Sequence, residues 1–142
     1  MITIPETNTE LRAEQVAAAF LSNIVDQLKI QNQVDISKSI FAIAVPIYLT
    51  EREREAFKDV MKVANLPTNN VVLINETSAV TAFYGVQWRN SLNADVAQNI
   101  LFVDVGHSHT AICTSSFTSK EAAVLAHASE RNFGGRNLDK AV

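Results

Sequence analysis

Two short apolar runs, each followed by a helical pattern, constrain the fold of this chain more than any other feature. Residues 40–45 read IFAIAV between Ser39 and Pro46, and residues 71–74 read VVLI. Continuous apolar runs of this length are typical of strands that are buried on both faces. Helical patterns follow each run, and the order strand, helix, strand, helix predicts a parallel sheet with right-handed crossovers. The fold class is therefore expected to be α/β.

The helix after the first run carries a complete start signal. Thr50 is the expected N-cap, and Glu53 three residues later completes a capping box. One apolar face follows at helical spacing, made of Phe57, Val60, Met61 and Ala64. The helix after the second run covers residues 76–84, and Gly85 is expected to close it in the left-handed conformation.

An earlier helix is expected from Arg12 to about Ile30. Its apolar residues Val16, Phe20, Ile24 and Leu28 recur on a period near 3.6, and Ala17–Ala19 are good helix formers. The residues before it, 1–10, are polar and are expected to be loosely ordered.

Beyond a polar stretch at residues 87–99 the pattern changes to short strands. Strands are expected at residues 100–105, 109–117 and 121–129, with turns between them, and residues 137–142 predict the first turns of a helix. We therefore divide the chain into residues 1–86, a linker at 87–99, and residues 100–142.

Composition excludes several classes of protein. The chain has 142 residues and 12 Lys and Arg against 15 Asp and Glu, which gives a net charge of −3. A strongly basic nucleic-acid binder is excluded, because neutralising phosphates needs clustered positive charge. No apolar run approaches the ~20 residues that span a bilayer, and the opening MITIPE predicts no secretory signal. The lone Cys113 excludes an internal disulfide framework.

The strongest candidate site follows the strand at residues 100–105. Asp104 ends this strand, and Gly106, His107 and Ser108 form a turn after it. A carboxylate here suits Mg²⁺ or its water, and glycine lets backbone N–H groups approach phosphate oxygens. An ordinary hairpin turn is the alternative interpretation.

Two further segments could bind an anion or a metal. Gly134 and Gly135 precede a predicted helix, whose free N–H groups would make an anion site; a plain Gly-Gly turn is the alternative. Glu76 lies at the end of the strand 71–74, where open α/β sheets bind ligands. The alternative for Glu76 is stabilisation of its own helix dipole.

A metal site made of His107, His109 and Cys113 is a weaker hypothesis, based on the sharing of one face by alternate strand residues. Their spacing matches no standard zinc signature and no fourth ligand is evident. Pro46 and Arg54 are further candidates after the first strand, with a solvated charge on the EREREAFK face as the alternative for Arg54.

Taken together and in this order, these segments resemble the nucleotide-binding domain of the 70-kDa heat-shock protein superfamily. The string IFAIAVPIYLTEREREAFKDVMKVANLPTNNVVLINETSAVTAFYG is similar to that family's VP-x-Y/F…R…A…NE-x-TA…YG pattern. ILFVDVGHSHTAIC lies where the family has its second phosphate loop, and FGGRNLDKAV resembles its Gly-Gly loop before a helix. The resemblance covers about residues 10–142. The forms D-x-G-H-S, N-E-T and G-G-R are similar to the 110-kDa branch, which includes fungal Sse-type proteins.

The resemblance implies a partial actin-like ATPase (ribonuclease H-like) fold, with the end of lobe I and the start of lobe II. It implies ATP or ADP with Mg²⁺ as cofactors in a longer parent protein. It also implies a cytoplasmic chaperone, with the nucleus as a second compartment, active in protein folding and the stress response. Such a protein would hold unfolded polypeptides and act as nucleotide exchange factor for 70-kDa heat-shock chaperones, with no nucleic-acid or membrane partner.

The resemblance also assigns roles to the candidate residues. Asp104, with Glu76, would hold Mg²⁺ through water, and Glu76 is the one candidate for a catalytic role. Pro46 and Arg54 would form a relay that couples the nucleotide state to a partner domain. Contacts to phosphate or sugar would come from Gly106, His107, Ser108, Gly134 and Gly135.

Two departures from the family's foldases bear on catalysis. The foldases read D-L-G-G-G-T in this loop, and the Thr is replaced here by His109 and the Asp two residues later by Ala111. Losing a hydroxyl and a carboxylate should weaken the positioning of the attacking water. The sequence also has no counterpart of the family's first phosphate loop or catalytic lysine. We therefore expect a fragment without ATPase activity of its own, and a parent that is at most a weak ATPase. The alternatives are an actin-fold ATPase or foldase, and a stand-alone interaction module that binds no nucleotide.

Overall fold

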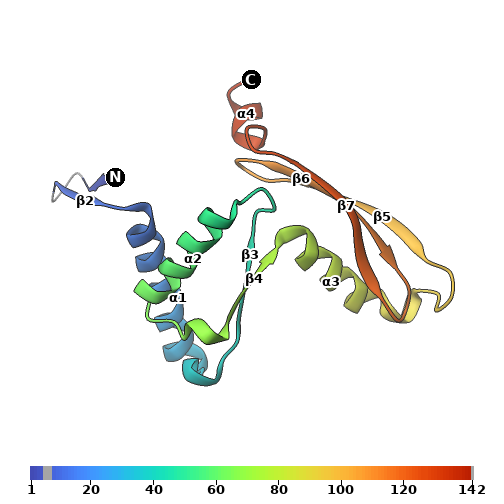
Figure 1. Cartoon of the computed structure of the whole chain (residues 1–142), viewed down its shortest axis with the longest axis horizontal. Coiled ribbons are helices and arrows are strands. Elements are labelled where there is room, and N and C mark those ends of the chain that lie inside the picture. Colours follow the sequence, from blue (N-terminus) through green and yellow to red (C-terminus); the bar gives the residue numbers. More distant parts are fainter. Residues whose placement is uncertain (5–7, 142) are drawn as a thin grey trace. The chain divides into compact units, whose positions relative to one another are not determined.

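The computed structural model describes residues 1–4 and 8–141 and shows a mixed α/β chain (Figure 1). The helices are α1 (Ala13–Asn32), α2 (Glu51–Val63), α3 (Glu76–Trp88) and α4 (Gly135–Asp139). The strands are β1 (Ile2–Ile4), β2 (Thr9–Leu11), β3 (Phe41–Val45), β4 (Val71–Asn75), β5 (Gln98–Val105), β6 (Thr110–Phe117) and β7 (Ala122–Glu130). Within the described ranges no helix combines the length and the apolar character that a membrane span requires.

The chain divides into two compact units. The first is Met1–Ile43 with Leu49–Leu73, and the second is Ala44–Tyr48 with Ile74–Val142. The stretch 87–99, expected as a linker, lies inside the second unit, where α3 extends to Trp88 and β5 begins at Gln98.

The first unit is built on α1 and α2. As predicted, Thr50 caps α2: its side-chain oxygen accepts from the Glu53 amide at 3.3 Å, and its own amide donates to the Glu53 carboxylate at 2.7 Å. The predicted apolar face of α2 is also confirmed, because Val60, Met61 and Ala64 are buried.

The helix predicted from Arg12 to about Ile30 is confirmed as α1, but the residues that show its helical period are not the ones it buries. Phe20 is 68% exposed, and α1 instead buries Ala18 and Val25 in the core that it shares with α2. The physical reason is the size of these side chains. An alanine between two helices allows a close approach, so the stripe with Ala18 packs inward and the stripe with Phe20 turns outward.

The strands β3 and β4 form a two-stranded sheet, and Figure 1 shows them running in the same direction, as expected. The expectation that both faces are buried is wrong. Ala42 and Ala44 of β3 are exposed, and Val72 of β4 is 51% exposed. In this chain an unbroken apolar run therefore predicts a strand, but it does not predict that both faces of the strand are buried.

The second unit contains an antiparallel sheet in the order β5-β6-β7, with α3 packed against β6 and β7. The residues of β6 that point to α3 alternate along the strand and are all buried: Ala111, Cys113, Ser115 and Phe117. Aromatic rings of Tyr84, Phe102 and Phe117 meet in this layer, with Tyr84 and Phe117 centroids 4.9 Å apart.

Gly85 does not close α3, contrary to expectation, and no glycine in the described ranges has a positive φ. Gly85 lies inside the helix, where a Cβ on it would be 3.0 Å from the Cβ of Ala122. The glycine therefore serves close helix–strand packing instead of helix termination.

The ends of the chain also differ from expectation. Ile2–Ile4 and Thr9–Leu11 pair as antiparallel strands, in contrast to the loose order expected for this polar segment; residues 5–7 lie outside the described residues. The last helix is shorter and starts earlier than the predicted 137–142, because Gly135 is its first residue. Residue 142 is also outside the described ranges.

Candidate functional site

The turn between β5 and β6 is held by the segment that opens α4. Within the turn, the Gly106 amide donates to the His109 carbonyl at 3.0 Å. From the α4 side, the Gly135 amide donates to the Gly106 carbonyl at 2.8 Å, and the Arg136 amide to the His107 carbonyl at 3.0 Å. Two segments that are separate candidates in the sequence are therefore bonded to each other through their backbones.

This arrangement changes the interpretation of the Gly-Gly pair. The amides of Gly134 and Gly135 are not free as expected, because Gly134 donates to the side chain of Asn137 at 3.1 Å and Gly135 donates to Gly106. Their observed role is to support the turn. A contact of either glycine with phosphate or sugar stays a prediction.

The turn itself still presents hydrogen-bond donors. Among the described residues, no acceptor is found for the backbone amides of His107 and Ser108. Adjacent unpaired amides in a turn form a concave site that favours anions. This pair is the best candidate in the chain for binding a phosphate oxygen.

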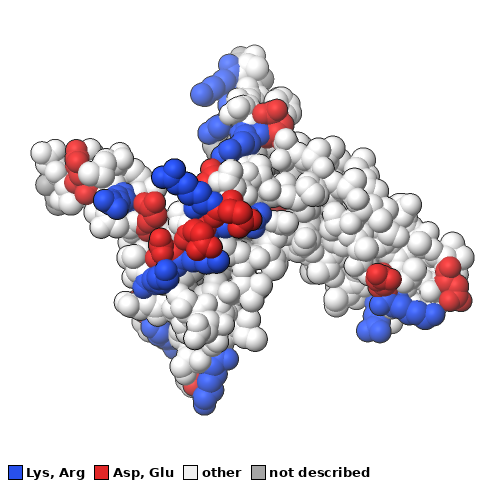
Figure 2. Space-filling view, in the orientation of Figure 1, with Lys and Arg blue, Asp and Glu red and all other residues white. Residues whose placement is uncertain are grey.

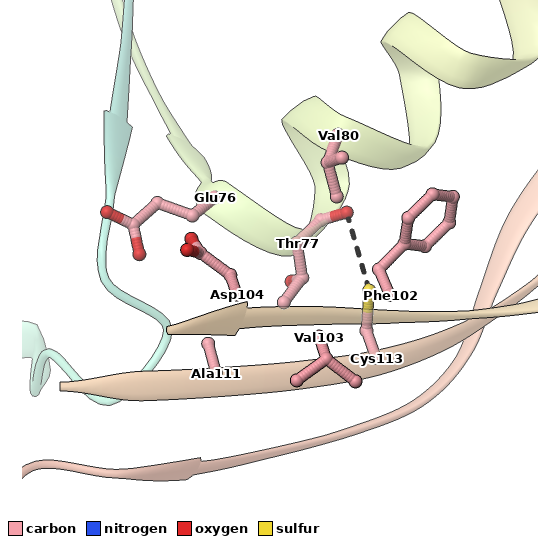
Figure 3. A pocket seen from close by; sticks show the side chains of 8 residues that line it. All are labelled: Glu76, Thr77, Val80, Phe102, Val103, Asp104, Ala111 and Cys113. Carbon is pink, nitrogen blue, oxygen red and sulfur yellow. Dashed lines mark hydrogen bonds between the residues drawn. The ribbon is translucent and has the colours of Figure 1, made fainter. Parts of the chain in front are cut away.

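A cavity of about 280 Å³ opens between the start of α3 and the sheet (Figure 3). Its walls are formed by Glu76, Thr77, Val80, Phe102, Val103, Asp104, Ala111 and Cys113. Figure 3 shows the carboxylates of Glu76 and Asp104 at the same end of this cavity. That they serve one binding site stays a prediction. The Asp104 carboxylate has no hydrogen-bond or ion-pair partner among the described residues.

Two polar groups in the cavity wall were missed by the sequence analysis. The Thr77 hydroxyl is buried without a hydrogen-bond partner in the described part of the chain, although the residue is only 4% exposed. The Thr77 carbonyl lies 3.9 Å from the Cys113 sulfur. A buried hydroxyl without a partner costs free energy, and no sequence signal distinguishes Thr77 from an ordinary helix residue.

His109 makes the most specific side-chain contact of the site. Its Nε2 lies 3.1 Å from an Oε2 of Glu76, and its Nδ1 lies 3.3 Å from the Ser108 hydroxyl. The Tyr48 ring meets the imidazole edge-on, with centroids 5.1 Å apart, and the Arg131 guanidinium lies 4.5 Å from the Tyr48 ring centre. In the sequence, His109 stands out only as a departure from a family pattern and as one member of the weaker metal hypothesis.

The structure does not assemble the alternative metal site. His107 lies in the turn, His109 binds Glu76, and Cys113 is buried against α3. Within the described ranges, no three His, Cys, Asp or Glu side chains come together as metal ligands.

A magnesium site fits these residues poorly. Mg²⁺ needs near-octahedral oxygen ligands, and Asp104 offers a carboxylate without a partner in the described part of the chain. Glu76, however, is engaged by His109, and Ala111 has no oxygen in its side chain.

The two residues expected to couple nucleotide state to a partner lie in different compact units. Pro46 directly follows β3 and belongs to the second unit, whereas Arg54 is in α2 and belongs to the first. The Arg54 Nε donates to the Leu49 carbonyl at 3.3 Å. The contact orients the guanidinium at the start of α2, so Arg54 is more than a freely solvated charge.

Charged residues are interleaved on the surface drawn in Figure 2, where basic and acidic side chains lie next to one another. On α2, Lys58 pairs with Glu55 at 2.6 Å and Lys62 with Asp59 at 2.8 Å. The Asp59 carboxylate raises the pKa of Lys62. Each of these two lysines therefore has an acidic neighbour on the same helix.

Comparison with known proteins identifies the family. The family model described as Hsp70 protein matches residues 1–142. The chain is 32% identical over 136 residues to an Sse-type heat shock protein homolog of Candida glabrata, which covers 95% of this chain and 19% of that protein. It is 33% identical over 98 residues to the heat shock 70 kDa protein 15 of Arabidopsis thaliana, covering 69% of this chain and 11% of the relative. It is 30% identical over 141 residues to the human heat shock 70 kDa protein 4, covering 98% and 16%.

The chain thus spans at most 19% of the length of these relatives. The resemblance inferred from the sequence is confirmed, including the similarity to Sse-type proteins. On this match over its whole length, the chain belongs to the Hsp70 protein family.

Proposed function

We propose that this chain contributes the phosphate-binding part of an ATP-binding chaperone of the 110-kDa heat-shock type. The observation that carries the proposal is the turn at residues 106–109. This turn contains the backbone amides of His107 and Ser108, for which no acceptor is found among the described residues. The cavity lined by Glu76 and Asp104 lies beside β5, the strand that leads into the turn. Adjacent turn amides of this kind suit the phosphate oxygens of ATP or ADP.

In this proposal the chain takes part in an actin-like fold with two lobes around one cleft. Residues 1–86 form the end of the first lobe, 87–99 a linker, and 100–142 the start of the second. The family match supports a place in such a fold, whereas the compact units of the structure divide the chain elsewhere, between Leu73 and Ile74.

The protein is proposed to retain nucleotide binding and to hydrolyse the nucleotide only weakly. Hydrolysis needs a positioned water and charge stabilisation at the transferred phosphoryl group. Ala111 lacks a carboxylate at the cavity wall, and Glu76, the one candidate for a catalytic role, already accepts a hydrogen bond from His109. A weak ATPase suits a nucleotide exchange factor better than a foldase.

The proposed partners are 70-kDa heat-shock chaperones and unfolded polypeptides, and the proposed compartment is the cytoplasm. Pro46 and Arg54 are proposed to transmit the nucleotide state to a partner domain. Support comes from the similarity to proteins named as heat shock proteins and from the placement of Arg54 at the start of α2.

The second candidate function is an interaction module that binds a chaperone partner without nucleotide. The observation in its favour is that the amides of Gly134 and Gly135 donate to Asn137 and to the turn, which leaves fewer donors for a phosphate. An active foldase-type ATPase is disfavoured by Ala111.

A thermal melt of the whole chain with and without ADP separates these candidates. A ligand that binds only the folded state stabilises it by about 2.7 kcal/mol at a hundredfold excess over Kd. The nucleotide proposal predicts a raised midpoint, which Ser108→Pro should reduce because it removes one of the two amides, and which the exposed Asp26→Asn on α1 should leave unchanged. A cooperative melt that ADP does not move would favour the interaction module.

A further inference from the structure

We propose that His109 is a positioning residue that engages Glu76 and keeps this carboxylate from binding a divalent cation. The turn at residues 106–109 then binds nucleotide with little dependence on Mg²⁺. This consequence rests on the function proposed above, whereas the weaker binding of divalent cations by Glu76 does not. The starting point is the 3.1 Å contact between His109 Nε2 and Glu76 Oε2.

The hydrogen bonds of the imidazole ring are mutually consistent. An ionised carboxylate only accepts, so the Nε2–H of His109 donates to Glu76. In the neutral ring, Nδ1 is then an acceptor, and the Ser108 hydroxyl at 3.3 Å can donate to it. Both ring nitrogens therefore have a partner.

The ring is also fixed by packing. Tyr48 meets it edge-on at an interplanar angle of 86°, and Arg131 lies over the Tyr48 ring. The His109 side chain is only 14% exposed, and that of Glu76 is 31% exposed. A contact that is shielded in this way and held from several elements is more than a chance surface pair.

The contact with His109 weakens the binding of a divalent cation to the Glu76 carboxylate. Mg²⁺ and Mn²⁺ bind through oxygen ligands in near-octahedral geometry. To use Glu76 directly, the cation must displace His109, and neighbouring Ala111 offers no replacement oxygen. Asp104 alone remains, and one carboxylate makes a weak site.

The direct test measures Mn²⁺ binding to the complete chain by electron paramagnetic resonance of the free ion. His109→Thr removes the donor to Glu76, and we expect about tenfold tighter Mn²⁺ binding, the size typical of changes around metal ligands. Adding Glu76→Gln should return the affinity to the original value. His109→Gln, whose amide can still donate to Glu76, should keep the weak binding of the unchanged protein.

His127→Thr is the matched control, because His127 is exposed on β7 and lies outside the cavity. It should leave Mn²⁺ binding unchanged. Equal Mn²⁺ affinity in the unchanged protein and His109→Thr would overturn the proposal. So would a His109→Thr affinity that Glu76→Gln does not lower.

A measurement on the unchanged protein covers the case in which a variant fails to fold. The ¹⁵N signals of the His109 ring should report an Nε2–H tautomer, and added Mn²⁺ should not broaden them selectively. Selective broadening at His109 and Glu76 would contradict the proposal without any substitution.

The nucleotide consequence is tested separately by titrating ADP with Mg²⁺ or with a chelator. The unchanged protein should bind ADP with similar affinity in both, whereas His109→Thr should bind about tenfold tighter with Mg²⁺. Absence of ADP binding under both conditions would contradict the proposed function and leave the Mn²⁺ result to decide the role of His109. Strong Mg²⁺ dependence in the unchanged protein would overturn the present inference alone.

Discussion

Gly134 approaches His107 so closely that a Cβ on Gly134 would lie 2.6 Å from the His107 carbonyl oxygen. The next-nearest atom is the Gly106 carbonyl oxygen, at 2.7 Å. Both obstacles are backbone atoms, which cannot rotate away as a side chain does. Gly134 itself has φ −165°, an extended conformation that any residue adopts. The need for glycine therefore comes from the contact between the two segments, not from backbone strain.

Gly134→Ala should separate the turn from α4 and lower the free energy of unfolding of the chain. Overpacking against rigid neighbours costs about 1–3 kcal/mol. Gly135→Ala is the matched control, because a Cβ there would make only an ordinary 3.7 Å contact with the Gly106 oxygen. Urea unfolding of both variants measures the difference, and an equal loss in the two would refute the close-contact explanation.

The pairing of this turn with α4 could not be predicted from either segment alone. The sequence identified Gly106 as a candidate because glycine lets backbone N–H groups approach phosphate oxygens, and Gly134 because it precedes a helix with free N–H groups. Which amides stay exposed depends on a contact between two segments that are separated in the sequence by the whole of β6 and β7. Local sequence patterns do not encode such a contact. From the sequence, only the family resemblance indicated that the two segments belong to the same site.

A buried hydroxyl pair joins α3 to β6. The Thr81 Oγ1 lies 2.7 Å from the Ser115 Oγ and also donates to the Thr77 carbonyl at 2.7 Å. Thr81→Val keeps the shape but leaves Ser115 without its closest partner, which should cost about 1–3 kcal/mol. Thermal unfolding measures the loss.

The double variant Thr81→Val with Ser115→Ala supplies the control. Removing both hydroxyls leaves no unpaired oxygen at this contact, so the double variant should lose less than the sum of the two single variants. Strict additivity would mean that the two hydroxyls act independently.

Element positions were predicted well where local chemistry determines them, and poorly where packing does. The Thr50 cap and the strands of the second unit follow from capping and from short apolar runs, so they could be read directly. The buried stripe of α1 could not be predicted, because the same periodicity allows more than one such stripe. Gly85 was wrongly assigned to helix termination, because a glycine can serve packing as well. For the candidate site, Asp104 and Glu76 were predicted to act together, but the contact of His109 with Glu76 required side-chain geometry.

The capping box of α2 gives a separate prediction for the first unit. Thr50→Ala removes the acceptor for the Glu53 amide and should lower the free energy of unfolding by about 1 kcal/mol. Thr50→Ser retains the oxygen and should cost much less. Chemical denaturation monitored by helical circular dichroism measures both; an equal loss would assign the effect to the methyl group instead of the cap.

Asp35 provides a prediction for the pH dependence of the first unit. The Ser37 hydroxyl, followed by the Lys38 side chain, lowers the pKa of the Asp35 carboxyl below its ordinary 3.8. A carboxyl whose pKa is lower in the folded state adds stability above its unfolded pKa, and this stability is lost as the pH falls through the folded pKa. The stability difference between the unchanged protein and Asp35→Asn should therefore be constant near neutral pH and shrink in acid below 3.8. Because the group is exposed, the difference is small and needs denaturant titrations at several pH values. A difference that grew on acidification would reverse the sign and refute the role given to Ser37 and Lys38.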